Sequence, residues 1–341
     1  MGKSSTKMPE VNLTDLLPHQ IPSVAYTIQN MWISLSAMVL AMASFFFTLW
    51  VVLPLSMTRP FFPKPKPSLP ETETKKVVLI IGASQGIGFS ILKQYADEPD
   101  TVIVAASRSI DSVRSMAIEL GDTVAMLKCA EVDLSGTRKQ ISEVIKSLDK
   151  LYGPISHLYE VSGISSHVKD HGVWGLDITG EMISVNVAGT VASVLSMYDL
   201  MKGRGYGKIC VVGSIAGLYS PANMISYAST KAFVNNFCTS LRILAAPTGV
   251  DVITVQPGLI DTRMTKHMRN QGSTVPGIEF GDPEGLAEQM KAAVEEGGMG
   301  IVNWPVRQGV IAYGLQAMNP ICQELGGWVL MKMNVAGKRI T

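Results

Sequence analysis

The sequence predicts an α/β protein with a doubly wound parallel sheet, preceded by one N-terminal transmembrane helix. Along residues 75–341, apolar runs rich in β-branched residues alternate with helical stretches, as in parallel sheets buried between layers of helices. The first such run, 77–81 (VVLII), leads directly into a glycine-rich loop. A separate, longer apolar segment at 31–55 stands well before this unit. These three observations define the predicted architecture.

The glycine-rich loop predicts nucleotide binding. Gly82, Gly86 and Gly88 have the spacing G-x-x-x-G-x-G and precede the helical stretch FSILKQYAD. Glycines let the backbone turn tightly and approach a pyrophosphate, while the helix N-terminus offers free N–H groups. The loop is weak as an isolated motif, but its place between a buried strand and a helix makes it strong. The expected contacts are Gly82, Ser84, Gln85, Gly86, Ile87 and Gly88.

Ser214, Tyr227 and Lys231 form a candidate catalytic group. Tyr227 and Lys231 are four residues apart and share one face of a predicted helix. A phenol with a pKa of about 10 is a poor base, but a neighbouring cation stabilises the phenolate and lowers that pKa. Ser214 ends the strand KICVVGS and would hydrogen-bond a substrate oxygen. Because Tyr-x-x-x-Lys also occurs by chance on helix surfaces, its meaning depends on the loop upstream.

Taken together, these motifs resemble the short-chain dehydrogenase/reductase family. The resemblance covers about residues 75–268 and includes Asn186 in VNVAG, and Pro257 and Gly258 followed by Thr262. It implies a Rossmann-like sheet, a nicotinamide cofactor and hydride transfer between an alcohol and a carbonyl. Several ordered motifs in one domain are far more specific than any single one.

The resemblance also implies a role for each residue. Tyr227 is expected as general acid/base, and Lys231 as the residue that binds the nicotinamide ribose and lowers the tyrosine pKa. Ser214 is expected to orient the carbonyl. Asn186 is expected to hold a water in a proton relay, and Asn186 and Tyr227 are also expected to contact the cofactor. The loop from Pro257 through Gly258 to Thr262 is expected to border the nicotinamide. No metal site is expected.

Two positions depart from the family pattern. Ile81 stands where threonine is usual before the first loop glycine, and Glu160-Val161-Ser162-Gly163 replaces the usual Asn-Asn-Ala-Gly. Both segments mainly support the cofactor site and the central sheet. They put local geometry and cofactor affinity in question, while the four expected catalytic residues are all present.

Charge favours NADP(H) over NAD(H). The second predicted strand, TVIVAAS, ends in Ser107-Arg108, without an acidic residue at its tip. A carboxylate there would bind a ribose 2′-hydroxyl, whereas an arginine accommodates a 2′-phosphate. Arg108 could equally be a solvated loop residue. Asp133 resembles the family aspartate that contacts adenine, or it is the N-terminal residue of the next helix.

The apolar segment at 31–55 predicts a membrane anchor. No charged residue occurs from 21 to 57, and about 20 apolar residues suffice to cross a bilayer. A cleavable signal peptide is the competing interpretation, but its apolar core is shorter and lies nearer the N-terminus. The predicted organisation is a tail at 1–30, the span at 31–55, a proline-rich basic linker at 56–74 and the enzyme domain at 75–341.

The basic linker predicts the orientation of this anchor. Arg59, Lys64 and Lys66 follow the span closely, whereas Lys3 and Lys7 are more distant on the other side. By the positive-inside rule the enzyme domain lies on the cytosolic side, and the expected site is the endoplasmic reticulum membrane. A lumenal domain remains the alternative.

The remaining segments carry weaker predictions. An irregular substrate lid is expected at 264–280, and the apolar tail at 309–333 has three open roles: packing, membrane contact or dimerisation. A homodimer is one expected partner. A net charge of +1 gives no reason for nucleic-acid binding. The four cysteines show no metal or disulfide spacing, so reduced thiols are expected.

The anchor beside a reductase domain suggests a lipophilic substrate. Membrane-anchored members of the family that this chain resembles include 3-ketosphinganine reductases and hydroxysteroid or retinoid dehydrogenases. 3-Ketosphinganine is one candidate, which the loop at 257–262 does not single out. The alternative is a catalytically weak, NADP(H)-binding sensor or scaffold tethered to the membrane, supported by the altered segment at 160–163.

Overall fold

The centre of the protein is a seven-stranded parallel sheet. The computed structural model describes residues 22–58, 61, 75–165, 175–219, 221–270 and 278–332. The strand order is β3-β2-β1-β4-β5-β6-β7, and every pairing is parallel. This confirms the predicted doubly wound α/β fold. The strands are β1 (Lys76–Ile81), β2 (Thr101–Ser107), β3 (Met126–Glu131), β4 (His157–Glu160), β5 (Gly207–Val212), β6 (Val250–Pro257) and β7 (Ile301–Trp304).

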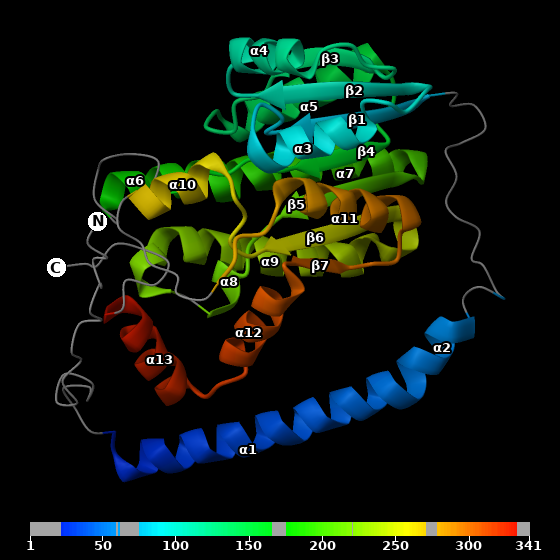
Figure 1. Cartoon of the computed structure of the whole chain (residues 1–341). Helices are drawn as coiled ribbons and strands as arrows, with labels where there is room; N and C mark the ends of the chain where they lie inside the picture. The colour runs from blue at the N-terminus through cyan, green and yellow to red at the C-terminus, as the bar shows by residue number, and fades with distance from the viewer. Residues whose placement is uncertain are drawn as a thin grey trace, which may run out of the picture.

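Helices cover both faces of this sheet (Figure 1). Apolar residues that alternate along the strands divide into two buried clusters, one on each face. One cluster packs against α3 (Gly86–Tyr95), α4 (Ile110–Leu120) and α11 (Pro283–Glu296). The other packs against α5 (Arg138–Tyr152), α7 (Thr190–Arg204) and α9 (Ile225–Ala245). Because the central strands are covered on both sides, their sequences are almost continuously apolar.

The order of the strands reverses between β1 and β4, which are neighbours in the sheet. In open α/β sheets the ligand crevice lies outside the carboxyl ends of the strands at such a reversal. The loops after β1, β4 and β5 therefore meet there, although they are far apart in sequence. This edge carries the candidate site.

The helix that precedes β5 is longer and less regular than expected. It begins at Leu176 instead of near Met182, as α6 (Leu176–Met182), a π-helical segment η4 (Ile183–Gly189) and α7. Gly189 is required at the junction, because a Cβ there would lie 2.4 Å from the Leu134 carbonyl oxygen. Small elements, α8 (Ala216–Tyr219), η5 (Ala222–Met224) and η6 (Ala246–Thr248), flank α9.

The expected irregular lid is partly helical. Residues 263–270 form α10 (Arg263–Asn270), and 271–277 lie outside the described residues. Met264 and Met268 stand four apart and so share the inner face, while the exposed Lys266 and Arg269 lie on the outside. The prediction of irregular structure was wrong for this part, because the amphipathic spacing outweighs its polar composition.

The N-terminal apolar segment is one long helix running from Val24 to Thr58, and it meets the length and hydropathy of a membrane span. It comprises α1 (Val24–Phe47), a π-helical segment η2 (Thr48–Val52) and α2 (Leu53–Thr58). Ser23 caps it by accepting a hydrogen bond from the Tyr26 backbone N–H. It thus begins seven residues before the expected span, within the expected tail. A second apolar helix, Leu176–Arg204, also meets that test, but it is 44% buried and packs on the sheet.

Beyond β7, the chain forms two helices on the side of the domain that faces α1 (Figure 1). These are α12 (Val306–Gln316) and α13 (Pro320–Lys332). Asn319, just before α13, donates a side-chain hydrogen bond of 2.7 Å to the Ser34 hydroxyl of α1. Most of the linker, 59–60 and 62–74, lies outside the described residues. All four cysteines are free thiols, as expected.

Candidate active site

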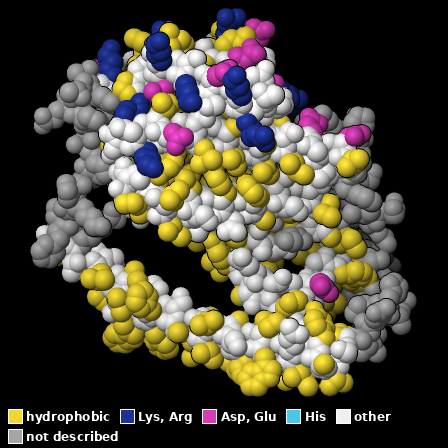
Figure 2. Space-filling model, turned by 180° about the vertical axis from the view of Figure 1, so that it is seen from behind, with side chains coloured by type: hydrophobic (Ala, Val, Ile, Leu, Met, Phe, Trp, Pro, Cys, Tyr) yellow, Lys and Arg dark blue, Asp and Glu magenta, His cyan; other side chains and the backbone are white. Residues whose placement is uncertain are grey.

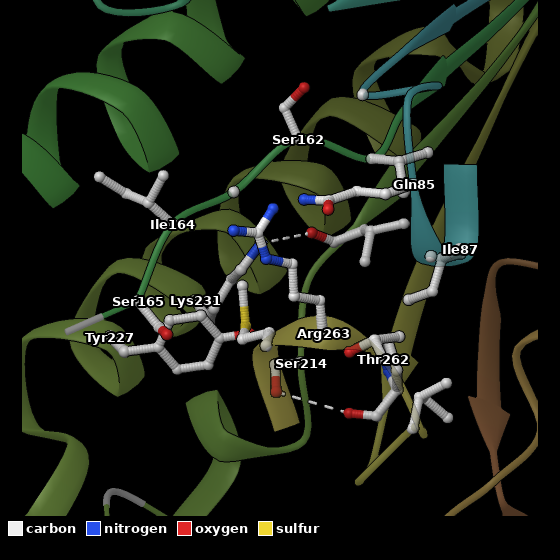
Figure 3. A pocket seen from close by; sticks show the side chains of 18 of the residues that line it. Gln85, Ile87, Ser162, Ile164, Ser165, Ser214, Tyr227, Lys231, Thr262 and Arg263 are labelled. Atoms are coloured by element: carbon white, nitrogen blue, oxygen red, sulfur yellow. Dashed lines mark hydrogen bonds between the residues drawn. The ribbon is translucent and has the colours of Figure 1, made fainter. Parts of the chain in front are cut away.

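A single cleft collects residues from the carboxyl ends of the strands. It has a volume of about 590 Å³ and is lined by the loops after β1, β2, β3, β4, β5 and β6, and by α9 and α10. Figure 3 shows side chains around it from the loops after β1, β4, β5 and β6 and from α9 and α10. Of the residues predicted from the sequence, those in the lining are Gly82, Ser84, Gln85, Gly86, Ile87, Ser107, Arg108, Asp133, Ser214, Tyr227, Lys231, Pro257, Gly258 and Thr262.

The glycine loop has the geometry of a phosphate cradle. Gly82 and Gly86 adopt positive φ angles of 96° and 56°, which residues with a Cβ rarely adopt. Gly86 is also the first residue of α3, so the helix N-terminus opens into the cleft. Gly88 lies outside the lining, and a Cβ there would come within 2.1 Å of the Gly82 carbonyl oxygen. It therefore keeps the loop and the helix in close contact.

The tips of β2 and β3 form the far end of the cleft. Ser107 and Arg108 both line it, and the Arg108 side chain is exposed. Asp133 also lines the cleft and accepts hydrogen bonds from the Ser135 backbone N–H (2.9 Å) and hydroxyl. The N-cap of α5 is Thr137. Asp133 is thus a turn residue at the cleft, and the helix-cap alternative is wrong.

Ser214, Tyr227 and Lys231 come together at the middle of the cleft. The Lys231 ammonium donates a 2.8 Å hydrogen bond to the Val212 carbonyl oxygen and lies 5.9 Å from the Tyr227 ring centroid. The Ser214 hydroxyl accepts from the Ala216 N–H at 3.1 Å. The Asn235 side chain, also on α9, donates to the Ser214 carbonyl at 2.9 Å. The strand end and the helix are therefore fixed to each other at the point where both supply polar groups.

Burial is the largest influence on the pKa values of Tyr227 and Lys231. It raises the pKa of Tyr227 to about 12, against an opposing hydrogen bond with Ser214. Burial also lowers the pKa of Lys231 to about 8, while the charge of Glu160 acts to raise it. We expected Lys231 to bring the Tyr227 pKa down. In this structure the lowering effect comes from the Ser214 hydrogen bond, and desolvation outweighs it, so the tyrosine is a phenol at neutral pH.

Asn186 lies behind the cleft wall, not in its lining. It is fully buried in η4. Its Oδ1 accepts from the Ile164 N–H at 2.8 Å, and its Nδ2 donates to the Ile164 carbonyl at 2.9 Å and the Thr230 hydroxyl at 3.2 Å. The asparagine thereby ties the segment after β4 to α9, one residue from Lys231.

The loop after β6 closes the other side. The Gly258 N–H donates to the Trp304 carbonyl at 2.8 Å, and the Leu259 N–H donates to the Gln308 side chain at 2.7 Å. A Cβ on Gly86 would lie 3.4 Å from the Thr262 methyl group, so this loop reaches the glycine loop. Pro257, Gly258 and Thr262 therefore line the cleft beside the glycine loop.

Some functional candidates were missed by the sequence reasoning. An apolar part of the lining comes from elements that carry no motif: Ile164, Tyr219, Met224, Met264 and Met268. Arg263, at the start of α10, also reaches into the cleft (Figure 3). The Met264–Met268 spacing was a readable signal of a helix. The others depend on loop packing that no local pattern reveals.

Comparison with known proteins identifies the family. Residues 76–273 match the family model described as short chain dehydrogenase. An NADP-dependent 3-hydroxy acid dehydrogenase of Schizosaccharomyces pombe is 31% identical over 194 residues, covering 56% of this chain and 73% of that protein. An uncharacterised oxidoreductase of Staphylococcus aureus is 28% identical over 194 residues, covering 56% and 81%.

The fold agrees with these matches. A short-chain dehydrogenase from Sphingobium yanoikuyae, solved in complex with NADPH, has a TM-score of 0.58 and 20% identity, and the match covers 70% of this chain and 95% of that one. The matched region contains the whole glycine loop, the strand end with Ser214 and the helix with Tyr227 and Lys231. This chain belongs to the short-chain dehydrogenase family of oxidoreductases.

Proposed function

We propose that this protein is a membrane-anchored, NADP(H)-dependent oxidoreductase that interconverts a carbonyl and an alcohol on a lipophilic substrate. The observation that carries the proposal is the convergence of Ser214, Tyr227 and Lys231 with the glycine loop in one cleft. A nucleotide cradle and a proton-donating group within one cavity are the two parts that hydride transfer requires.

The residues present fit a phosphorylated dinucleotide. The left-handed glycines and the open N-terminus of α3 suit a pyrophosphate. Arg108 lines the cleft at the tip of β2, where Ser107-Arg108 stands instead of an acidic residue, which suits a 2′-phosphate. The Sphingobium structure and the Schizosaccharomyces enzyme, which use NADPH and NADP respectively by their names, support the same choice. When bound, NADPH supplies the hydride for the carbonyl carbon.

The protein's own residues supply the proton and the orientation. Ser214 holds the substrate oxygen by a hydrogen bond, and Tyr227 gives that oxygen its proton. Because burial keeps Tyr227 a phenol at neutral pH, the site is prepared for carbonyl reduction. Lys231 holds the nicotinamide ribose and stabilises the phenolate left after proton transfer. Asn186 positions the wall at Ile164 and belongs to the relay that reprotonates the tyrosine.

An apolar substrate suits both the cleft and the surface near it. The cleft beyond Tyr227 is lined by Met224, Met264 and Met268, flexible side chains that adapt to varied apolar shapes. Helix α13 packs against η5, which carries Met224. Exposed apolar residues of α12, α13 and the turn between them are Val306, Val310, Ile311, Tyr313, Met318 and Leu325, and they stand beside the exposed polar residues Arg307, Gln316, Gln323 and Glu324.

This apolar surface faces the N-terminal helix. Figure 2 shows apolar side chains gathered on that helix and on the end of the domain nearest to it, while lysines and arginines gather toward the opposite end. The arrangement supports a bilayer around residues 24–58 and a cleft that opens near its surface. The basic linker favours a cytosolic domain on the endoplasmic reticulum. A ketolipid such as 3-ketosphinganine, or a steroid- or retinoid-like ketone, is the proposed substrate class.

Purified full-length protein in nanodiscs tests this directly. NADPH oxidation is followed while lipid extracts, fractionated by polarity, are added one at a time. Consumption with an apolar ketone-containing fraction supports the proposal, and the reduced alcohol is identified by mass spectrometry. Binding of NADPH without turnover against any fraction or ketone panel would instead favour a tethered sensor or scaffold. Turnover of water-soluble 3-oxo acids alone would overturn the lipophilic substrate class.

A further inference from the structure

Glu160 is a buried carboxyl group beside the active site that no catalytic motif explains. It ends β4, between Ile81 of β1 and Val211 of β5, and is 1% exposed. An unpaired buried carboxylate would be very costly, so such a group is retained only where it is hydrogen-bonded or paired with a charge. The short-chain dehydrogenase family, to which this chain belongs, usually has a neutral asparagine at this position.

The contacts of Glu160 suit the ionised form. Its Oε2 accepts a hydrogen bond of 2.8 Å from the hydroxyl of Ser193 on α7. Its Oε1 accepts one of 3.2 Å from the Ser162 backbone N–H. The Ser162 N–H can only donate, and a donor stabilises a carboxylate over a carboxylic acid; the single Ser193 hydrogen is shared with the Thr190 carbonyl at 3.0 Å. The bond from the Ser162 N–H holds the backbone that forms this part of the cleft wall.

That backbone leads straight to the catalytic lysine. Gly163 follows Ser162, and a Cβ on Gly163 would lie 3.4 Å from the Lys231 ammonium nitrogen. That ammonium donates its hydrogen bond to a neutral acceptor, the Val212 carbonyl. A fully buried cation in this setting needs a nearby negative charge to remain protonated.

We propose that Glu160 is a positioning residue of the active site, whose buried negative charge keeps Lys231 protonated and whose hydrogen bond holds the 162–163 backbone against it. This rests on the proposed function, in which Lys231 acts as a cation. It assigns a purpose to the altered segment after β4, which otherwise stands as a departure from the family pattern.

The ionisation of the two groups is mutually linked. Burial raises the pKa of Glu160 to about 7, against opposing effects of Ser193, Ser162 and the Lys231 charge. Burial lowers the pKa of Lys231 to about 8, and Glu160 acts to raise it. Among the described residues, Cys238 on α9 also responds to Glu160, and it acts to raise the pKa of Lys231 as well. Glu160 becomes ionised near neutral pH. Its negative charge therefore stabilises protonated Lys231 over the pH range in which the lysine would begin to lose its proton.

NMR of full-length protein in detergent, labelled with ¹³Cε-lysine, tests this without any substrate. The Lys231 signal is assigned by its loss in Lys231→Arg. Glu160→Gln removes the charge but keeps the side chain's size, and should lower the Lys231 midpoint by ~1 pH unit. Ser193→Ala removes a hydrogen bond that lowers the Glu160 pKa, so Glu160 should ionise at higher pH and the Lys231 midpoint should fall by less than in Glu160→Gln. Glu143→Gln, an exposed carboxylate on α5, should change nothing.

A second measurement needs no variant. In wild type the Lys231 signal should show a small inflection near pH 7, when Glu160 ionises. An unshifted midpoint in Glu160→Gln would overturn the role of the charge. If Glu160→Gln does not fold, a missing wild-type inflection overturns it equally.

Turnover then separates this inference from the proposed function. The alkaline limb of the kcat/KM profile should move to lower pH in Glu160→Gln by the same amount as the NMR midpoint, while a purely structural defect would lower the profile without moving it. If no substrate is reduced, the proposed function fails, whereas the NMR titration still decides the role of Glu160.

Discussion

The ammonium of Lys231 lies 5.9 Å from the ring centroid of Tyr227, while its hydrogen bond goes to the Val212 carbonyl at 2.8 Å. The lysine is thus held by the end of β5, and the helix spacing of four residues presents both side chains to the same cleft. This relationship makes the lysine a fixed element of the site and not a mobile surface charge. The following predictions depend on it and on the structure around it.

Tyr227→Phe should reduce kcat with the lipophilic ketone by at least ~100-fold, since general acid catalysis contributes 10²–10⁴-fold. The phenyl ring keeps the packing, so the Kd of NADPH, measured by protein fluorescence quenching, should stay within about twofold of wild type. Tyr219→Phe, on the cleft edge, is the matched control and should retain turnover. Full activity in Tyr227→Phe would contradict the proposed mechanism.

Arg108→Ala should weaken NADPH binding by ~10- to 100-fold and leave NADH binding nearly unchanged. The hydrogen bond between an arginine and a phosphate is charge-assisted and therefore strong. NADH lacks the 2′-phosphate that accepts this bond, so its affinity should not depend on Arg108. Titration of both nucleotides at two salt concentrations measures the effect. Arg114→Ala, on the exposed part of α4 next to Asp111, is the control. Equal losses for both nucleotides would show that Arg108 does not read the phosphate.

Gly88→Ala should destabilise the protein by about 1–3 kcal/mol and abolish measurable nucleotide binding. The added methyl group meets the Gly82 backbone oxygen at 2.1 Å, so the loop and α3 must separate. Denaturant unfolding and NADPH titration measure the two effects. Gly180→Ala places a methyl where no atom lies within 4 Å, and should leave both unchanged or slightly raise helix stability. Normal binding by Gly88→Ala would refute the tight-packing role.

Glu295→Gln should lower the melting temperature at pH 7, and the deficit should shrink as the pH falls below about 4. Glu295 contacts Lys76 at 2.9 Å and the Tyr95 hydroxyl at 2.9 Å. Burial acts to raise its pKa, but His157, Lys76 and Tyr95 together lower it. A lowered folded-state pKa means stability that is present above the unfolded pKa and lost as the pH falls through the folded value.

Calorimetry from pH 3 to 8 measures this dependence. Glu284→Gln is the matched control, because its ion pair with Lys93 is largely exposed and surface pairs contribute little. A deficit for Glu295→Gln that stays constant over the whole pH range would show that the carboxylate charge is not what stabilises the network.

Deletion of residues 24–58 should release the protein from membranes. The full chain should resist alkaline carbonate extraction, since a helix of this length and hydropathy meets the requirement for a span. Retention of the shortened protein on carbonate-washed membranes would contradict the role of this helix as the anchor. Extraction of the full chain by carbonate would rule out a transmembrane anchor.

The sequence by itself determined the fold class, because buried parallel strands require continuous apolar runs such as Val77–Ile81 and a phosphate cradle requires glycines at fixed offsets. It also predicted Ser214, Tyr227 and Lys231 as the candidate catalytic group, because the end of a strand and a helix spacing of four residues determine where such side chains point. The long apolar helix was equally visible, although its start at Val24 depended on the cap at Ser23.

Only the tertiary structure decided how these groups ionise and what surrounds them. Glu160 and Lys231 are far apart in sequence, and their linkage arises because β4 and α9 meet at the same sheet edge. Asn186 likewise proved to be buried behind the wall, through contacts made by a π-helical segment. Desolvation depends on every atom packed around a group, so no local pattern could have predicted that Tyr227 stays a phenol.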